Sequence, residues 1–261
     1  MTKELTIIKL GGSVITNKNR PYVARKKVIQ RLAREIQKAH MSVLIVHGSG
    51  SFGHTSASKY GGIHGYTNKW GIAKVARDAM AINAIVRDVF LDEQLPVISL
   101  SPMSMIISKE GVLYDSFFYP IKHVLNQNLI PLLYGDGIWD EEWNSTIFSG
   151  ERVITELIPF LLSQHFVIKK VIEVGNTNGV YDLTGKTIPV ITENTLIYQL
   201  ESIKGSFSKD VTGGMQHKVQ EALKQSKIGV QTQIINGEIP GELLCCLQGK
   251  LTKGTTICLR G

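Results

Sequence analysis

Residues 5–12 read LTIIKLGG, a mostly apolar run that carries one lysine and ends in two glycines. A run of this length, closed by glycines, is typical of a strand that is buried on both faces and enters a tight loop. Similar runs return at residues 42–48, SVLIVHG, and at residues 130–135, IPLLYG. Strands buried on both faces belong to parallel sheets that are covered by helices. These stretches therefore indicate an α/β fold.

Segments with helical periodicity lie between these runs. The apolar residues of segment 24–39 recur at helical spacing, which predicts an amphipathic helix. The remaining pattern predicts helices at 70–92, 151–162 and 215–227, strands at 96–100, 169–174, 230–235 and 255–259, and a hairpin at 138–149. Alternating strands and helices predict an open αβα sandwich around a mainly parallel sheet. A new strand–loop–helix series begins near residue 168, so we expect an N-terminal lobe, 1–167, and a C-terminal lobe, 168–261.

The composition excludes several classes of protein. The chain has 261 residues, of which 43% are apolar and 20% are charged, so it can bury a substantial core and is not a disordered chain. No stretch approaches the roughly 20 apolar residues of a membrane helix, and the apolar run before Lys9 is too short for a secretory signal. The three cysteines form neither a disulfide framework nor a metal-binding pattern. We expect a cytoplasmic protein with no membrane partner and no metal ligands in its cysteines.

The charge balance points to an anionic partner. The net charge is +7, from 29 Lys and Arg against 22 Asp and Glu. Such an excess indicates either a basic surface or binding of an anion. No basic run is interleaved with aromatic residues, so we expect no nucleic acid and favour a small phosphorylated ligand.

Three glycine-rich loops follow predicted strands. They are KLGGSVITNK at 9–18, HGSGSFGH at 47–54 and KDVTGGM at 209–215, which precedes a helix that bears Lys218. In open parallel sheets, ligands bind outside the carboxyl ends of the strands. Glycines let backbone N–H groups approach a phosphate closely, and helix N-termini add positive potential. One such loop is more often an ordinary turn, but three in one chain, each beside lysine or histidine, indicate a phosphate site.

Lys9 stands inside an apolar strand, where an unpaired ammonium is unfavourable. It is either an edge-strand lysine that reaches solvent or a functional charge at the carboxyl edge of the sheet. Residues 48–53 also match GxGxxG after a strand, but a dinucleotide site needs an acid about 20 residues further on. Lys69 and Lys74 occupy that distance and Asp78 lies beyond it, so a dehydrogenase is disfavoured.

The motifs taken together resemble a known superfamily. In chain order they are KLGGSVIT at 9–16 with Lys18, HGSGSFGH at 47–54, YGDG at 134–137, SGE at 149–151, NGVYD at 178–182 and DVTGGM at 210–215 with Lys218. They resemble the amino acid kinase superfamily over essentially the whole chain. Within it they are most similar to the isopentenyl phosphate kinases, with the fosfomycin kinases as near relatives. The second and last motifs together are specific, whereas either alone is only suggestive.

The resemblance implies an ATP-dependent kinase that uses Mg²⁺, acts on a small phosphate such as isopentenyl phosphate, and forms a homodimer. The N-terminal lobe would bind the acceptor phosphate and the C-terminal lobe ATP. By resemblance, Lys9 meets the nucleotide phosphates, Lys18 stabilises the transferring phosphoryl group and His54 binds the acceptor phosphate. The implied nucleotide positions are Lys9, Gly11, Gly12, Ser13, Gly50, Asn176, Tyr181, Gly213 and Lys218, and the implied acceptor positions are Gly48, Ser49, His54 and Gly150.

Two motifs depart from the superfamily. Its SGD becomes SGE at 149–151, one methylene longer, and its DVDG becomes NTNG at 176–179. Asparagine keeps the turn geometry but not the charge. The acceptor could therefore be another small phosphate, a phosphonate such as fosfomycin or another anion. The non-catalytic alternative is a nucleotide-sensing module that binds ATP without turnover. The presence of all the lysines and the histidine of the motifs argues against it.

The first half of the predicted helix 70–92 carries the apolar residues Ile72, Ala73, Val75, Ala76 and Met80. These residues could line a pocket for a short apolar tail, and they are equally what a core-facing helix contains. We favour packing in the core.

Overall fold

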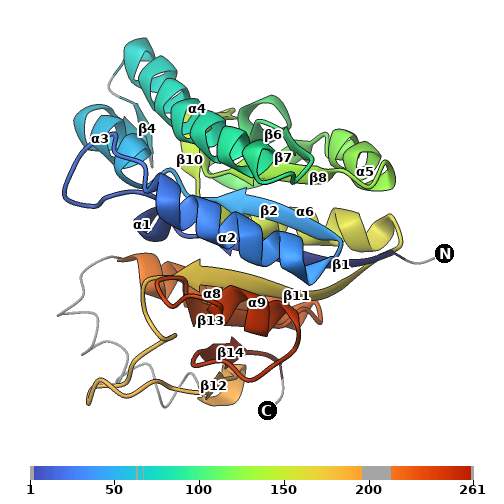
Figure 1. Cartoon of the computed structure of the whole chain (residues 1–261). Coiled ribbons are helices and arrows are strands. Elements are labelled where there is room, and N and C mark those ends of the chain that lie inside the picture. Colours follow the sequence, from blue (N-terminus) through green and yellow to red (C-terminus); the bar gives the residue numbers. More distant parts are fainter. Residues whose placement is uncertain (1–2, 63, 67, 196–212, 260–261) are drawn as a thin grey trace.

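The computed structural model describes residues 3–62, 64–66, 68–195 and 213–259, and its centre is a large sheet (Figure 1). The strands of this sheet are β1 (Lys3–Leu10), β2 (Val43–His47), β5 (Val97–Ser99), β8 (Ile130–Tyr134), β11 (Phe166–Gly175), β12 (Val190–Ile191), β13 (Thr232–Asn236) and β14 (Thr255–Ile257). Within the described residues they form one eight-stranded sheet in the order β12-β14-β13-β11-β1-β2-β8-β5. Neighbouring strands are parallel except β13 and β14. The sheet is therefore mainly parallel, as predicted.

Helices cover both faces of the sheet. They are α1 (Gly12–Ile15), α2 (Lys26–Ala39), α3 (Gly50–Tyr60), α4 (Lys69–Asp92), α5 (Tyr119–Asn126), α6 (Gly150–Ser163), α8 (Gly213–Lys227) and α9 (Glu242–Leu247). One core joins α2, α4 and α9 to Ile8 and Ile45, and a second joins α5 and α6 to Ile7 and Leu44. Adjacent strand residues thus serve opposite faces, which confirms the open αβα sandwich. No helix in the described ranges is long and apolar enough to cross a lipid bilayer.

Short elements outside the main sheet pack beside α4. A second sheet has the order β10-β9-β6-β7, and β3 pairs with β4 in a small hairpin. Their bounds are β3 (Gly61–Gly62), β4 (Gly65–Tyr66), η1 (Pro102–Ser104), β6 (Ile106–Lys109), β7 (Val112–Ser116), β9 (Asp136–Asp140) and β10 (Asn144–Phe148). The antiparallel pair β9–β10 confirms the hairpin predicted at 138–149.

Some local predictions were wrong. Residues 50–60 form α3, although the sequence predicted a glycine-rich loop at 47–54, because contacts with α4 stabilise a segment rich in weak helix formers. On α4, Ala73 and Met80 are exposed, contrary to the prediction, whereas Val75 is buried as predicted, together with Ala79 and Ile82. The short elements α1, β6, β7, α5 and α9 were not predicted. The hydrophobic periodicity of these segments is weak, and contacts with distant parts of the chain determine their structure.

Candidate active site

Three loops converge where β1, β2 and β11 end. In the parallel register, Leu10 at the end of β1 lies opposite His47 of β2 and Val174 of β11. The glycine loops that follow β1 and β2, and the asparagine turn that follows β11, therefore start at one edge of the sheet. This edge is where an open parallel sheet binds ligands.

The first two glycine loops touch each other through their backbones. A Cβ atom on Gly12 would lie 2.5 Å from the Gly50 nitrogen, and one on Gly48 would lie 2.8 Å from the Gly12 nitrogen. Gly50 also has a left-handed φ of 51°, which favours glycine. Because α3 begins at Gly50, its N-terminus faces this junction. The Ser51 N–H already donates a 3.0 Å hydrogen bond to the Thr16 hydroxyl, so the junction suits an anion through the positive end of the α3 dipole rather than through that N–H group.

Four charged side chains meet at the same edge, three of them buried and the fourth, Lys218, half-buried. Lys9 is 4% exposed and forms an ion pair with Glu151 at the start of α6. Glu173, the β11 neighbour of Lys9, places its Oε2 atom 3.7 Å from the Lys9 Nζ and 3.8 Å from the Lys218 Nζ. Because β1 lies in the middle of the sheet, Lys9 is not an edge-strand lysine. We call Lys9, Glu151, Glu173 and Lys218 the charged cluster.

Burial and mutual attraction set the protonation of the charged cluster. Burial lowers the pKa of Lys9, but attraction to Glu151 and Glu173 outweighs it and leaves that pKa raised. Burial likewise raises the pKa of Glu151, yet attraction to Lys9 and Lys218 holds it well below its usual range. For Glu173 burial prevails and raises the pKa to about 7. Burial, followed by repulsion from Lys9, lowers the pKa of Lys218. Lys9 and Glu151 therefore form the ionised pair, and Glu173 titrates near neutrality.

The N-terminus of α6 closes one side of the charged cluster. Ser149 caps the helix by accepting a hydrogen bond from the Arg152 N–H, and its Oγ also lies 2.6 Å from the His217 Nε2 of α8. A Cβ atom on Gly150 would lie 3.4 Å from the Lys9 Cε. The SGE motif thus places Glu151 against Lys9 and links α6 to α8.

The asparagine turn after β11 borders the first glycine loop. Ser13 donates a 3.4 Å hydrogen bond from its Oγ to the Asn176 Oδ1. The Asn178 N–H donates to the Tyr181 hydroxyl at 3.0 Å, and the Asn178 Oδ1 accepts from the Asn236 amide at 2.9 Å. The two asparagines that replace family carboxylates therefore keep an ordered turn through neutral hydrogen bonds.

Two predicted lysines, Lys18 and Lys218, lie within electrostatic reach of each other. Lys18 is exposed on the turn after α1, and its charge helps to lower the pKa of Lys218. Lys218 lies beside the asparagine turn, because a Cβ atom on Gly175 would be 3.4 Å from its Nζ. Gly213 begins α8. Residues 209–212 of the third glycine loop lie outside the described residues.

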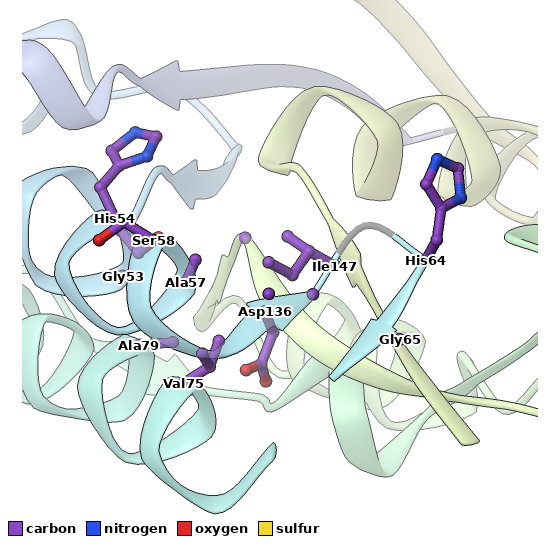
Figure 2. A pocket seen from close by; sticks show the side chains of 14 residues that line it. Gly53, His54, Ala57, Ser58, His64, Gly65, Val75, Ala79, Asp136 and Ile147 are labelled. Carbon is purple, nitrogen blue, oxygen red and sulfur yellow. The ribbon is translucent and has the colours of Figure 1, made fainter. Parts of the chain in front are cut away.

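A pocket of about 650 Å³ opens beside the glycine loop of β2. In Figure 2, His54 of α3 and His64 of the β3–β4 turn flank the pocket, with Ile147 between them and Asp136 at its base. The lining is Ser49, Gly53, His54, Ala57, Ser58, Gly61, Gly62, His64, Gly65, Val75, Ala79, Gly135, Asp136 and Ile147. The volume is in the range of small-molecule sites. A mostly apolar wall with histidines at its rim suits an anionic head on an apolar tail.

Two buried titratable groups support the pocket and the loop. Burial raises the pKa of Asp136 to about 7, and its Oδ2 accepts a 3.1 Å hydrogen bond from the Ser101 hydroxyl. Burial lowers the pKa of His47 to about 4, so its ring is neutral at pH 7. With Nδ1 protonated, the ring donates to the Gly48 carbonyl and accepts from the Asn83 amide, each at 3.1 Å. His47 therefore fixes the loop rather than contributing charge.

Several side chains of this region were not predicted as site residues. Glu151 and Asp136 lay within the SGE and YGDG motifs of the sequence, whereas Glu173, His64 and His217 lay in none of its motifs. Glu173 carried a readable signal, because VIEVG at 171–175 repeats the feature that marked Lys9, one charge in an apolar strand before a glycine. His64 and His217 carried none, since long-range packing alone brings them to the site.

Comparisons with known proteins agree with this geometry. The chain matches the model of the amino acid kinase family over residues 4–236. Isopentenyl phosphate kinase from Methanothermobacter thermautotrophicus is 32% identical and that from Methanocaldococcus jannaschii 30% identical, each over 97% of this chain and 98% of the relative. X-ray structures of isopentenyl phosphate kinase match with a TM-score of 0.81 at 28% identity, over 97% of this chain and 99% of theirs. The chain therefore belongs to the amino acid kinase family and is a kinase.

Proposed function

We propose that this kinase transfers the γ-phosphoryl group of ATP to isopentenyl phosphate and so forms isopentenyl diphosphate. The observation that carries the proposal is the backbone contact between Gly12 and Gly50, which joins the histidine-rimmed apolar pocket to the charged cluster. A phosphate with an apolar tail in the pocket would then meet a nucleotide phosphate held at the cluster. Relatives of nearly equal length carry the name of this activity.

The proposal divides the site between two lobes. Residues 1–167 would bind the acceptor, with its phosphate at His54 and the loop around Ser49. Residues 168–261 would bind ATP, beside Asn176 and Tyr181. Lys9 and Lys218, which both face Glu173, would neutralise the nucleotide phosphates, together with the N–H groups of Gly12 and Ser13 at the start of α1. Lys18 is exposed and free to reach the phosphoryl group in transfer.

Phosphoryl transfer does not require the protein to form a covalent bond with the substrate. Phosphoryl transfer depends mainly on alignment and on neutralising charge as it develops. A phosphate monoester is already an anionic nucleophile at neutral pH, so no side chain has to remove a proton from it. His54 is suited to donating a hydrogen bond to that phosphate, and a buried general base is not required.

Mg²⁺ would enter with ATP. In the described part of the chain, no group of three His, Cys, Asp or Glu side chains could hold a metal ion. Glu151 and Glu173 are engaged with the lysines of the charged cluster. Mg²⁺ commonly binds substrate phosphates and water with few protein ligands. The residues therefore fit an ion held mainly by the nucleotide, where it would neutralise phosphate charge.

An acceptor panel with ATP and Mg²⁺, scored by ADP release and product mass, tests the proposal. Isopentenyl phosphate and methyl phosphate share a head group, so their comparison isolates the tail. Burying the tail is worth about 1.5–3 kcal/mol, so kcat/KM should favour isopentenyl phosphate about 10- to 100-fold. Preference for a phosphonate such as fosfomycin would instead place this enzyme with the fosfomycin kinases. ATP binding without turnover of any acceptor would favour a nucleotide sensor.

We also propose a cytoplasmic homodimer. Strand β7 is an edge strand, and its Val112 and Tyr114 are each 65% exposed. Exposed apolar edge strands are prone to pair with a second chain. The cysteines form no disulfide, which fits a reducing compartment. Light scattering should give twice the chain mass, and Val112→Lys should give the monomer; a monomeric wild type would contradict the dimer.

A further inference from the structure

Glu173 is a buried carboxylate that has no role in the proposed phosphoryl transfer. It is 2% exposed in the central strand β11, directly opposite Lys9. Its Oε2 atom makes no hydrogen bond within the described residues, yet it lies at nearly equal distances, 3.7 and 3.8 Å, from the Lys9 and Lys218 ammonium groups. Buried polar atoms in folded proteins are normally satisfied, so this oxygen needs an explanation.

The groups that face Glu173 come from three elements. Lys9 projects from β1, Glu151 from α6 and Lys218 from α8. Glu151 already pairs closely with Lys9, so Glu173 is the second of two carboxylates for two lysines. Two positive and two negative charges balance while no phosphate is bound, which is how a site this buried can keep both lysines charged.

A nucleotide upsets this balance. Its phosphates bring several negative charges to Lys9 and Lys218, and an ionised Glu173 between the two lysines would repel them. Glu151 is held ionised by its close pair with Lys9, whereas the pKa of Glu173 is raised by burial to about 7. Glu173 is therefore the carboxylate of the charged cluster that can most easily give up its charge.

We propose that Glu173 is a proton-linked positioning residue: ionised, it holds the Lys9 and Lys218 ammonium groups in place in the free enzyme, and it takes a proton from solvent onto Oε2 when nucleotide phosphate binds. The only bond formed is the O–H bond of the carboxylic acid. Both lysines then direct their charge to the phosphates. This inference rests on the proposed nucleotide site but not on the identity of the acceptor.

Calorimetry of ADP binding at pH 7.5, in buffers of different ionisation enthalpy, tests the proposal. The dependence of the heat on the buffer gives the number of protons exchanged. Wild type should take up about half a proton or more per nucleotide relative to Glu173→Gln, since a group with a pKa near 7 is mostly ionised at that pH. Any ionisation of ADP itself contributes equally to both proteins and cancels in the difference.

Glu221→Gln is the matched control. Glu221 is also a buried glutamate with an unpaired Oε2 among the described residues, but it pairs with Lys224 on α8 rather than with the charged cluster. This variant should show the wild-type proton uptake. Equal uptake in wild type and Glu173→Gln would overturn the proposal. ADP that fails to bind at all would overturn the nucleotide site as well, so the two failures are distinguishable.

A second measurement covers the case in which Glu173→Gln does not fold. In wild type, after subtraction of the protons that ADP itself exchanges over the same pH range, proton uptake should be largest near pH 7–8 and should shrink below about pH 6, where Glu173 is already protonated. Glu173→Asp keeps a carboxyl group and should retain uptake. A wild-type uptake that does not change between pH 5.5 and pH 8 would contradict the assignment to Glu173.

Discussion

The pocket and the charged cluster lie at one sheet edge, yet they are built in opposite ways. Two residues of the cluster, Lys9 and Glu173, come from the central strands β1 and β11, the other two come from α6 and α8, and the four charges pair with one another. The pocket is formed by α3, α4 and short strands outside the main sheet, and its two histidines are exposed. We infer that the rigid cluster serves the phosphates that every reaction of a kinase shares, and the looser pocket serves the acceptor. Variants in the cluster should therefore alter stability and catalysis together, whereas pocket variants should alter acceptor use alone.

The largest effect is expected for Lys9→Met. This change leaves Glu151 and Glu173 buried without their shared cation, and removal of one partner from a buried ion pair costs about 3–5 kcal/mol. Urea titration should show that loss in the free energy of unfolding, and phosphoryl transfer should fall below detection.

The double variant Lys9→Met/Glu151→Gln sharpens this test. Replacing both members of a buried pair is far less destabilising than removing one. The double variant should therefore recover part of the lost stability while remaining inactive. A single Lys9→Met variant as stable as wild type would show that the cluster charges are independent of one another.

Lys18→Ala should separate catalysis from stability. Lys18 is exposed, so its loss should change the free energy of unfolding by less than about 0.5 kcal/mol. Loss of a contact made only in the transition state should lower kcat about 100-fold or more with little change in the KM for ATP. Lys27→Ala, on the exposed face of α2, is the matched control and should behave as wild type. A loss confined to KM would limit Lys18 to ground-state binding.

His54→Ala should damage acceptor use and spare ATP. A charge-assisted hydrogen bond to the acceptor phosphate is worth roughly 1.5–3 kcal/mol, so kcat/KM for that acceptor should fall about 10- to 100-fold. His54→Gln retains a donor and should recover part of the loss. ATP affinity from calorimetry should hardly change in either variant. Loss of ATP binding with acceptor affinity intact would reverse the assignment of the two lobes.

The smallest effect is expected in the pH dependence of the free energy of unfolding, to which the pocket and the charged cluster each contribute one carboxyl group. Burial raises the pKa of Asp136 below the pocket and of Glu173 in the cluster to about 7. Between about pH 4 and 7 each carboxyl binds more protons in the folded chain than in the unfolded chain. The stability it contributes is therefore lost as pH rises through 7, by at most about 1.4 kcal/mol per pH unit for each group.

Urea unfolding at pH 5.5, 6.5 and 7.5 measures this slope. Asp136→Asn and Glu173→Gln should each make it less negative than in wild type. A variant with an unchanged slope would show that its carboxyl group titrates normally.

The sequence predicted the central fold because its signals are local. Mostly apolar runs marked β1, β2 and β8, and a lysine within the first of them marked the ligand edge. Parallel strands end together, so the convergence of the first two glycine loops followed from the fold class. The structure adds their backbone contact, which depends on the side-chain-free Gly12 and Gly50.

The pocket could not be predicted because its wall is assembled over long range. The glycines at 61–65, Ile147 of β10 and Ala79 of α4 meet only through tertiary packing. Helix α3 was hidden because its sequence, GSFGHTSASKY, is poor in helix formers. Glu173, which lies opposite Lys9 on β11, stands out in the sequence VIEVG as one charge in an apolar strand. Only the strand register shows that it faces Lys9.

The backbone contact between Gly12 and Gly50 also constrains how this enzyme can evolve. Neither position has room for a side chain, so a substitution there would push the two loops apart before it changed what the pocket accepts. If the pocket binds the acceptor as we propose, new acceptor preferences should arise at the pocket-lining positions 57, 58, 61, 62, 64, 65 and 147. A mutant library for a new acceptor should vary these positions, because substitutions there leave the charged cluster and the Gly12–Gly50 contact unchanged.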